Sequence, residues 1–444
     1  MKLFTSLNNF GIFNTFIFLL LCSGCGNTDE PAAITETATK TEADIDSENK
    51  AIEAIKALGG EIALDDTGNV TQVDFYLDDI SDAGLVHLKG LTNLTTLNLE
   101  FTNVSDAGLV HLKELTRLTT LNLAFTKVTN AGLVHLKGLT NLMTLDLKDT
   151  NVSDAGLLYL IVYLKGLTSL TTLNLEGTKV SDLLLVHLKG LTNLTTLNLK
   201  DTNVSDAGLV HLEELPNLTT LNLEKTKVSD AGLVHLKGLT NLTALNLYGT
   251  NISDAGLIHL KERTNLTALN LDFTKVSDAG LVHLKGLTNL TMLNLKDTKV
   301  SDAGFVYLKG LTKLTTLDIS RTKISNAGLV ILEEFTNLTT LNLENTNAND
   351  AGLVHLKGLT NLTTLYLSGT NNFSDAGLVY LEDLKNITTL YLRFTNVTDA
   401  GLEHLKGLSK LTYLNLYGSK ITKAGVMKLE AAIPDCEISH HLGI

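Results

Sequence analysis

Leucine residues follow a pattern with a period of 24 residues from Val70 to the C-terminus. One unit, residues 94–117, reads LTTLNLEFTNVSDAGLVHLKELTR, and the opening copy at Val70 is followed by fourteen further copies. Each copy repeats the same order of apolar and polar positions. A fixed period of this length indicates that most of the chain is an array of one small structural unit.

Each unit predicts a short strand followed by a short helix. Leu97 and Leu99 alternate with polar residues, which is typical of a strand with its leucines inward. Ser105 is a good N-cap for a helix whose apolar stripe includes Leu109. Between strand and helix, the hydroxyl of Thr102 is expected to be buried and to hydrogen-bond to backbone in the turn, because a buried polar group needs a partner.

One unit cannot bury its own leucine stripe, so the units are expected to stack on one another. Stacking predicts an α/β solenoid shaped as a horseshoe, with a parallel sheet on the concave face, short helices on the convex face and about 15 repeats. With strands about 4.8 Å apart, the sheet spans on the order of 70 Å. The prediction is therefore an extended concave surface with no obvious pocket.

These units resemble leucine-rich repeats. The segment T-x-V-S-D-A-G-L after the strand is similar to the cysteine-containing subtype known from F-box substrate receptors and from many bacterial extracytoplasmic proteins. Thr102, Thr126 and Thr150 stand where most repeats of the superfamily have Asn. The resemblance implies a recognition scaffold without enzymatic activity.

The N-terminus resembles a bacterial lipoprotein signal. An apolar stretch over residues 10–21 ends in LLLCSGCGNTDE, where Ser23 and Gly24 precede Cys25. The resemblance implies that the Cys25 thiol takes a diacylglyceryl group, that acyl chains such as palmitate anchor the protein, and that Gly26 favours the outer membrane. The alternatives are a signal peptide cleaved without lipidation and an uncleaved anchor.

These patterns divide the chain into five predicted segments. They are a lipoprotein signal peptide (1–24), an acidic flexible tether (25–46), an N-terminal capping helix and linker (47–69), the repeat array (70–432) and a C-terminal cap (433–444). The tether contains almost no large apolar side chains and cannot bury a core. The capping helix is expected to begin at Ser47 as its N-cap.

Composition and motifs narrow the possible functions. The net charge is −13, with acidic and basic residues interspersed, which argues against the clustered basic surface of a nucleic-acid binder. Three cysteines cannot form a disulfide framework. The sequence lacks G-x-S-x-G, H-E-x-x-H and glycine-rich phosphate loops. We therefore predict no catalytic residues, no metal and no cofactor.

Stacking turns every repeated position into a row in space. Ten histidines, from His87 to His404, share one helix position and could bind a transition metal or sense pH. The simpler interpretation is a row copied by duplication, with no carboxylate beside the rings. A row of aspartates that includes Asp106 could bind calcium, but helix N–H groups would satisfy these carboxylates without a cation.

The strands near the C-terminus depart from the template. A concave position that is Asn or Asp in eleven repeats becomes Tyr366 and Tyr391, and the positions just beyond it hold Arg393, Phe394 and Tyr417. Aromatic and arginine side chains are enriched in binding hot spots, so we predict a ligand-binding surface here. The rings could equally stack on sugars, and the alternative to binding is that they cover the end of the sheet.

Two further surfaces are candidates. Phe101 and Phe125 lie in adjacent repeats and form a second aromatic patch. The stretch AGLLYLIVYLKG contains four extra residues, and Ile161, Val162 and Tyr163 would form a dimer or partner patch if they are exposed.

We therefore expect an exported, lipid-anchored protein of the cell envelope whose concave face recognises a protein partner. The alternatives are binding of a glycan or cell-wall polymer and a structural role in the envelope. The two binding hypotheses differ in whether soluble saccharides compete.

Overall fold

The computed structural model describes residues 42–77, 79–154, 166–369 and 372–441. The predicted signal peptide, Cys25, most of the tether and the insertion at 161–163 lie outside these residues. The chain divides into two units, Met1–Lys50 and Ala51–Ile444. The described part of the first unit is the beginning of helix α2 (Glu42–Ala57), and the repeats belong to the second unit.

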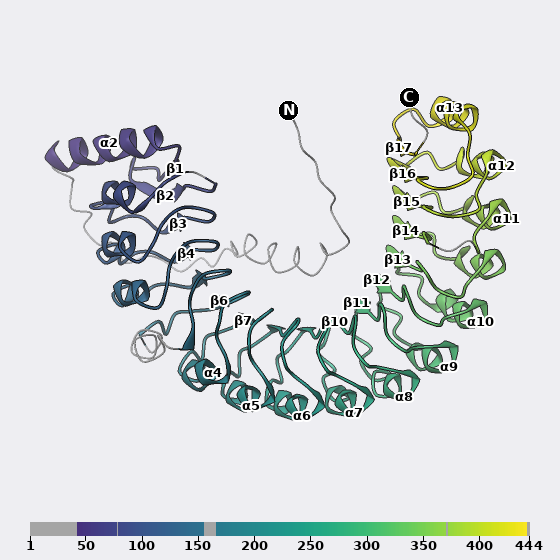
Figure 1. Cartoon of the computed structure of the whole chain (residues 1–444), viewed down its shortest axis with the longest axis horizontal. Coiled ribbons are helices and arrows are strands. Elements are labelled where there is room, and N and C mark those ends of the chain that lie inside the picture. Colours follow the sequence, from purple (N-terminus) through teal and green to yellow (C-terminus); the bar gives the residue numbers. More distant parts are fainter. Residues whose placement is uncertain (1–41, 78, 155–165, 370–371, 442–444) are drawn as a thin grey trace. The chain divides into compact units, whose positions relative to one another are not determined.

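Residues of the second unit form one sheet of seventeen strands, and their order in the sheet follows their order in the sequence (Figure 1). The fifteen strands from β2 to β16 are parallel and in register, one strand for each repeat. The sheet lines the inner face of the arc and the helices lie outside it. The predicted α/β solenoid of about 15 repeats is confirmed.

Most strands have only three residues. The strands are β1 (Glu61–Leu64), β2 (Val70–Asp74), β3 (Thr96–Asn98), β4 (Thr120–Asn122), β5 (Thr144–Asp146), β6 (Thr172–Asn174), β7 (Thr196–Asn198), β8 (Thr220–Asn222), β9 (Ala244–Asn246), β10 (Ala268–Asn270), β11 (Met292–Asn294), β12 (Thr316–Asp318), β13 (Thr340–Asn342), β14 (Thr364–Tyr366), β15 (Thr389–Tyr391), β16 (Tyr413–Asn415) and β17 (Glu437–Ser439).

The outer elements are short helices, many of them a single turn long. They are the α-helices α4 (Asp182–Leu188), α5 (Asp206–Leu209), α6 (Asp230–Leu233), α7 (Asp254–Leu257), α8 (Asp278–Leu281), α9 (Asp302–Phe305), α10 (Asn326–Leu329), α11 (Asp375–Leu378), α12 (Asp399–Leu402) and α13 (Lys423–Ala432), and the 3₁₀ helices η1 (Asp82–Leu88), η2 (Gly108–Leu112), η3 (Gly132–Leu136) and η10 (Asp350–Leu356). In several repeats a 3₁₀ turn continues the α-helix directly.

The leucines of each repeat form one continuous core between sheet and helices. Leu97 and Leu99 of the strand and Leu109 of the helical turn are completely buried, as their spacing predicted. The hydroxyl of Thr102 donates to the carbonyl oxygen of Leu99 at 2.7 Å, and the same bond recurs in the other repeats, for example from Thr126. The predicted role of the buried threonine is therefore confirmed.

Both ends of the sheet differ from the prediction in detail. Helix α2 already includes Glu42, so Ser47 lies inside the helix and not at its N-cap. Acidic residues in the first turn, such as Asp44, favour that earlier start because they interact well with the helix dipole. At the N-terminal edge β1 pairs antiparallel with β2, a strand that the sequence did not predict. At the other edge β17 pairs parallel with β16, and Cys436 is buried beside it.

Neighbouring repeats are joined by a ladder of aspartates, which corrects the interpretation that each Asp caps its own helix. Asp230 accepts from the backbone N–H of Ser253 at 2.7 Å and from its hydroxyl at 2.5 Å, one repeat further on. The ladder also contains the pairs Asp82–Ser105, Asp106–Thr129, Asp182–Ser205, Asp206–Ser229, Asp254–Ser277, Asp278–Ser301, Asp350–Ser374, Asp375–Thr398 and Asp399–Thr422.

The aspartate ladder explains the glycine in each Asp-Ala-Gly segment. A Cβ atom on Gly256 would lie 2.5 Å from Oδ1 of Asp230, a contact that real Cβ atoms do not make. Glycine leaves room for the carboxylate of the preceding repeat, although Asp154 makes the same bonds to Ser181 where Leu184 replaces the glycine.

The turn after each strand has a fixed left-handed residue, immediately before the buried threonine. Phe101, Phe273 and Phe394 have φ values of 58°, 55° and 52° at this position. Gly249 and Gly418 occupy it in other repeats, also with positive φ. Glycine adopts this conformation freely, whereas a bulky residue there is strained by roughly 1–2 kcal/mol.

Two carboxylates are buried in the middle of the sheet surface. Burial, and secondly the nearby Asp318, raise the pKa of Asp272 to about 8. Burial likewise raises the pKa of Asp318. One oxygen of Asp272 accepts from the backbone N–H of Lys296 at 2.7 Å, which partly offsets the burial. Folding therefore favours the neutral form of Asp272.

We expect Asp230→Ala to lower the free energy of unfolding by about 1–3 kcal/mol, because Ser253 loses both of its acceptors. Gly256→Ala should also destabilise, since its Cβ meets the carboxylate. The double variant should lose less free energy of unfolding than the two single variants together, because Asp230→Ala removes the carboxylate that the new Cβ meets. Denaturant midpoints of all four proteins test this, and strict additivity would contradict the assigned contact.

We expect Asp272→Asn to stabilise the protein at pH 7–8 by on the order of 1–3 kcal/mol. A raised folded pKa means that the stability associated with Asp272 is present below about pH 4 and is lost as the pH rises toward 8. The gain should therefore vanish near pH 4. The melting temperature measured from pH 4 to 8 tests this, with Asp297→Asn on the exposed turn of the next repeat as the control. A pH-independent gain would contradict it.

Candidate functional site

Three tyrosines form a row across strands β14, β15 and β16 on the concave face, here called the tyrosine row. Tyr366 and Tyr391 are directly paired in register and stack with ring centroids 4.5 Å apart and planes 14° from parallel. Tyr413 lies 5.5 Å from Tyr391 at 53°. Tyr413 was not predicted, although the sequence contains a sign of it. A tyrosine stands here at the position that Thr389 holds in the preceding strand.

A second group, the arginine cluster, consists of Arg393, Phe394, Tyr417 and His441. The Arg393 guanidinium lies 5.6 Å from the Phe394 ring centroid and 5.7 Å from that of Tyr417. Phe394 meets Tyr417 edge to face at 5.8 Å, and Tyr417 meets His441 at 6.0 Å. The structure thus brings the five predicted residues together as two adjacent groups and adds Tyr413 and His441.

His441 reaches the arginine cluster through the C-terminal tail. The N–H of Gly418 donates to Nδ1 of His441 at 3.2 Å, which fixes the imidazole beside Tyr417. No periodic signal pointed to His441, because the residues after 432 leave the repeat template.

Phe394 is placed at the cost of backbone strain. It has a positive φ of 52°, and its side chain is 50% exposed. A Cβ atom on Gly418 would lie 2.4 Å from the Phe394 ring, so the glycine of the next repeat leaves space for that ring. A strained, exposed aromatic residue with a neighbour shaped to accommodate it is typical of a functional position.

The hydroxyls of Tyr366 and Tyr391 are protonated at neutral pH. Burial raises the pKa of Tyr366 to about 12, with the neighbouring Tyr391 as the next contribution. Burial and the nearby Tyr413 also raise the pKa of Tyr391. The tyrosine row therefore offers neutral hydroxyl groups, and Arg393 supplies a positive charge beside it.

The second predicted patch is also assembled. Phe101 and Phe125 stack with centroids 4.1 Å apart and planes 8° from parallel. Tyr76 meets Phe101 edge to face at 6.0 Å, and Lys148 lies 5.3 Å from the Phe125 ring centroid. Both phenylalanines occupy the left-handed turn position.

Tyr248 and Phe273 form a third aromatic group, which was not predicted from the sequence. Tyr248 and Phe273 lie 5.0 Å apart, with Lys225 over the tyrosine and Lys296 over the phenylalanine. Phe273 occupies the same turn position as Phe101, and that shared position was the signal that could have found it.

Between these aromatic groups, ion pairs occupy the concave face. Nζ of Lys200 lies 3.3 Å from carboxylate oxygens of both Glu176 and Glu224, and Lys148 lies 3.2 Å from Glu176. These partly buried charges are neutralised by one another across four repeats. They hold the sheet surface together and leave little free charge for a ligand.

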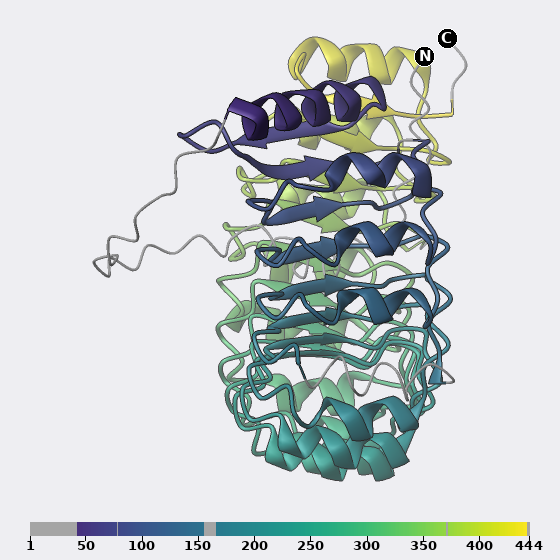
Figure 2. The same ribbon diagram turned by 90° about the vertical axis from the view of Figure 1, so that its left-hand side faces the viewer.

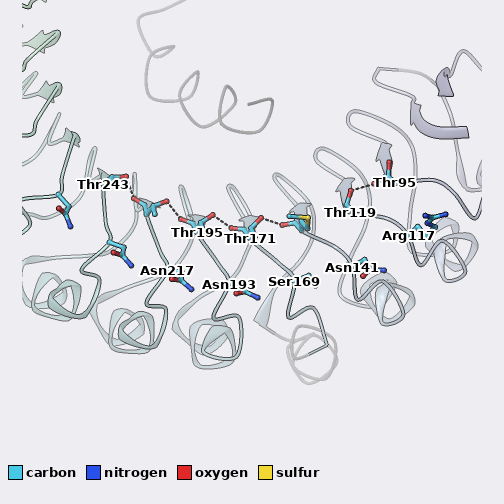
Figure 3. Close-up of a pocket in the computed structure, with 14 residues that line it drawn as sticks. Thr95, Arg117, Thr119, Asn141, Ser169, Thr171, Asn193, Thr195, Asn217 and Thr243 are labelled. Atoms are coloured by element: carbon cyan, nitrogen blue, oxygen red, sulfur yellow. Dashed lines mark hydrogen bonds between the residues drawn. The ribbon is translucent and has the colours of Figure 1, made fainter. Parts of the chain in front are cut away.

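A groove runs along the side of the array where the strands begin, between the sheet and the outer helices (Figure 3). Its volume is about 1080 Å³, and it is lined by threonine and asparagine rows such as Thr195 and Asn193. The Thr195 hydroxyl donates to the carbonyl oxygen of Thr171, and the Asn193 amide donates to that of Thr168. These side chains therefore use hydrogen-bond donors to hold neighbouring repeats together.

The histidine row differs from the expectation that carboxylates are absent. Nδ1 of His235 lies 2.8 Å from Glu213, and the same pairing joins His355 to Glu333 and His404 to Glu382. Within the described ranges, no cluster of three or more His, Cys, Asp or Glu residues is arranged to hold a metal ion. No described helix is long and apolar enough to cross a membrane.

Comparison with solved structures shows the same fold elsewhere. An internalin, InlF, from Listeria monocytogenes is 24% identical, with 84% of this chain and 94% of that chain covered and a TM-score of 0.51. The functional domain of InlJ from Listeria monocytogenes is 21% identical, with 83% and 71% covered and a TM-score of 0.52. No match was found among curated proteins.

Family models identify the family to which the chain belongs, whereas the solved structures show only the fold. A model described as "Leucine-rich repeat region" matches residues 125–441, and one described as "Leucine Rich repeat" matches residues 90–113. Because the first match alone spans more than half of the chain, this protein belongs to the leucine-rich repeat family.

Proposed function

We propose that this protein is a lipid-anchored recognition scaffold of the cell envelope, without enzymatic activity, that binds a protein partner through the tyrosine row and the arginine cluster. The observation that carries the proposal is the strained, exposed Phe394, held between Arg393 and the glycine that makes room for it. The extracytoplasmic repeat subtype and the Cys25 anchor at the outer membrane, inferred from sequence resemblance, complete the proposal.

The chemistry of the two groups suits a protein interface. Tyrosine, phenylalanine and arginine combine a large contact area with polar tips, and such residues dominate binding energy when clustered. Phe394 and Tyr417 are 50% and 45% exposed, so their apolar area is available. Arg393 adds a planar donor next to both rings. One contiguous surface therefore offers apolar area, hydroxyl groups and a cation.

Stacking within the tyrosine row favours a protein over a saccharide. A sugar ring stacks on the open face of an aromatic ring, but Tyr366 and Tyr391 already cover each other's faces at 4.5 Å. In-register strands place these rings side by side, so that each ring covers one face of the other and leaves its edge for contact. Edges and hydroxyl groups match the varied side chains of a protein surface better than the flat face of a pyranose.

We expect the full chain to retain a partner from envelope extracts that the triple variant Tyr391→Asn, Arg393→Glu, Phe394→Gly loses. The substitutions return this repeat to residues found elsewhere at the same positions, so the fold should persist. Phe273→Gly is the control, because it changes the same turn position in another repeat. Capture of the same partner by the triple variant would contradict the proposal. Competition by soluble saccharides would favour the glycan alternative.

We expect Phe394→Gly to change the free energy of unfolding by less than about 1 kcal/mol, because relief of the left-handed strain offsets the lost contacts and the added chain entropy. Binding should nevertheless weaken at least tenfold. The denaturant midpoint, read beside the pull-down, tests both expectations. A loss above about 2 kcal/mol would mean that Phe394 mainly covers the end of the sheet.

A further inference from the structure

One side of the solenoid carries a row of lysines that the proposed function does not use. The residue directly before the buried apolar residue that follows the turn is Lys or Asn in every repeat from the second onward. This set, here called the flank row, consists of Asn103, Lys127, Asn151, Lys179, Asn203, Lys227, Asn251, Lys275, Lys299, Lys323, Asn347, Asn372, Asn396 and Lys420. All seven lysines are exposed.

The flank row is continuous in space, because backbone bonds hold successive members together. The N–H of Lys299 donates to the carbonyl of Val276 at 2.8 Å, and that of Lys323 donates to the carbonyl of Val300 at 2.9 Å. Parallel bridges join Ser277 to Lys299 and Ser301 to Lys323. Lys275, Lys299 and Lys323 therefore lie in adjacent rungs.

Three adjacent lysines repel one another unless an anion lies over them. Elsewhere in the flank row lysine follows asparagine, and Nζ of Lys227 donates to the Asn203 amide oxygen at 3.0 Å. Lys275 has the same bond to Asn251, whereas Lys299 and Lys323 follow lysines. Three exposed lysines thus lie in adjacent rungs of a protein with a net charge of −13.

Exposed phenylalanines border the flank row. Phe273 lies two residues before Lys275, has a positive φ of 55° and is 38% exposed. Phe101, at the same turn position, is 42% exposed. Glycine fills this position without strain in other repeats, so the large apolar side chains are not required by the turn.

We propose that the flank row docks this solenoid onto an anionic lipid surface, with the turn phenylalanines at the level of the headgroups. Lysines attracted to anionic lipids beside aromatic side chains are the combination that holds proteins at membrane interfaces. The proposal goes beyond partner recognition and uses other residues, since Lys275, Lys299 and Lys323 are outside both the tyrosine row and the arginine cluster.

The curvature of the array favours a flat, extended ligand. The repeats curve in the plane of Figure 1, and Figure 2 shows them from the side as a stack with loops aligned along each border. A flat surface can therefore touch the flank row over many repeats at once, whereas it would touch a convex face at few points. Docking on this side also leaves the concave face open to a partner.

The test uses the full chain with Cys25→Ser, so that lipidation cannot supply binding, and vesicles of phosphatidylcholine with or without phosphatidylglycerol. The flank variant Lys275→Gln, Lys299→Gln, Lys323→Gln is compared with a control of equal charge, Lys189→Gln, Lys237→Gln, Lys285→Gln, on the convex side. Since each lysine contributes about fivefold to partitioning, the flank variant should bind anionic vesicles on the order of 100-fold more weakly. The control should stay within about threefold of the parent.

Three results would overturn the proposal. Equal weakening in both triple variants would show that only net charge matters. If the Cys25→Ser protein binds vesicles without phosphatidylglycerol equally well, its membrane binding would come from the apolar N-terminal segment. Retention on dextran sulfate resin without binding to anionic vesicles would mean that the flank row takes a soluble polyanion. Loss confined to the flank variant, and weakened by added salt, supports the proposal.

Discussion

The fold depends on one constraint: a single 24-residue unit has a leucine stripe that it cannot bury alone. Leu97, Leu99 and Leu109 become fully buried only because the repeats on either side cover them. Register follows from the same constraint, because any other offset between neighbouring repeats would expose leucines. Both ends need a cover, and the β1–β2 hairpin with helix α2 and the β17 strand provide it.

Stacking in register has a chemical consequence, since each template position becomes a row and most rows are used internally. The aspartate ladder binds the next repeat, and the threonine and asparagine rows of the groove hold neighbouring carbonyls. Lys200 is shared between two glutamates. Many of the acidic side chains are therefore hydrogen-bonded or ion-paired within the solenoid, whereas the lysines of the flank row are exposed.

Departures from the template are informative because the other repeats show which residue each position usually holds. Phe394 occupies a position that glycine fills without strain at Gly418, and Gly418 in turn leaves room for the phenylalanine ring. Tyr366 and Tyr391 replace asparagines that otherwise bond to the sheet backbone, so they give up a structural bond for exposed area. These departures in two neighbouring repeats are the basis of the binding surface proposed above.

The sequence by itself determined the repeat period, the strand and helix positions, the leucine core, the buried threonine bond and the family, because these follow from periodicities of two and 24 residues. It also located five members of the candidate site as exceptions to the template. It did not reveal that Asp230 bonds to Ser253 of the next repeat, that His441 joins Tyr417, or that Phe273 belongs to the same strained class as Phe394. Those relations join residues far apart in the chain or depend on φ angles, and only the packed tertiary structure, which sets the spacing between repeats, decides them.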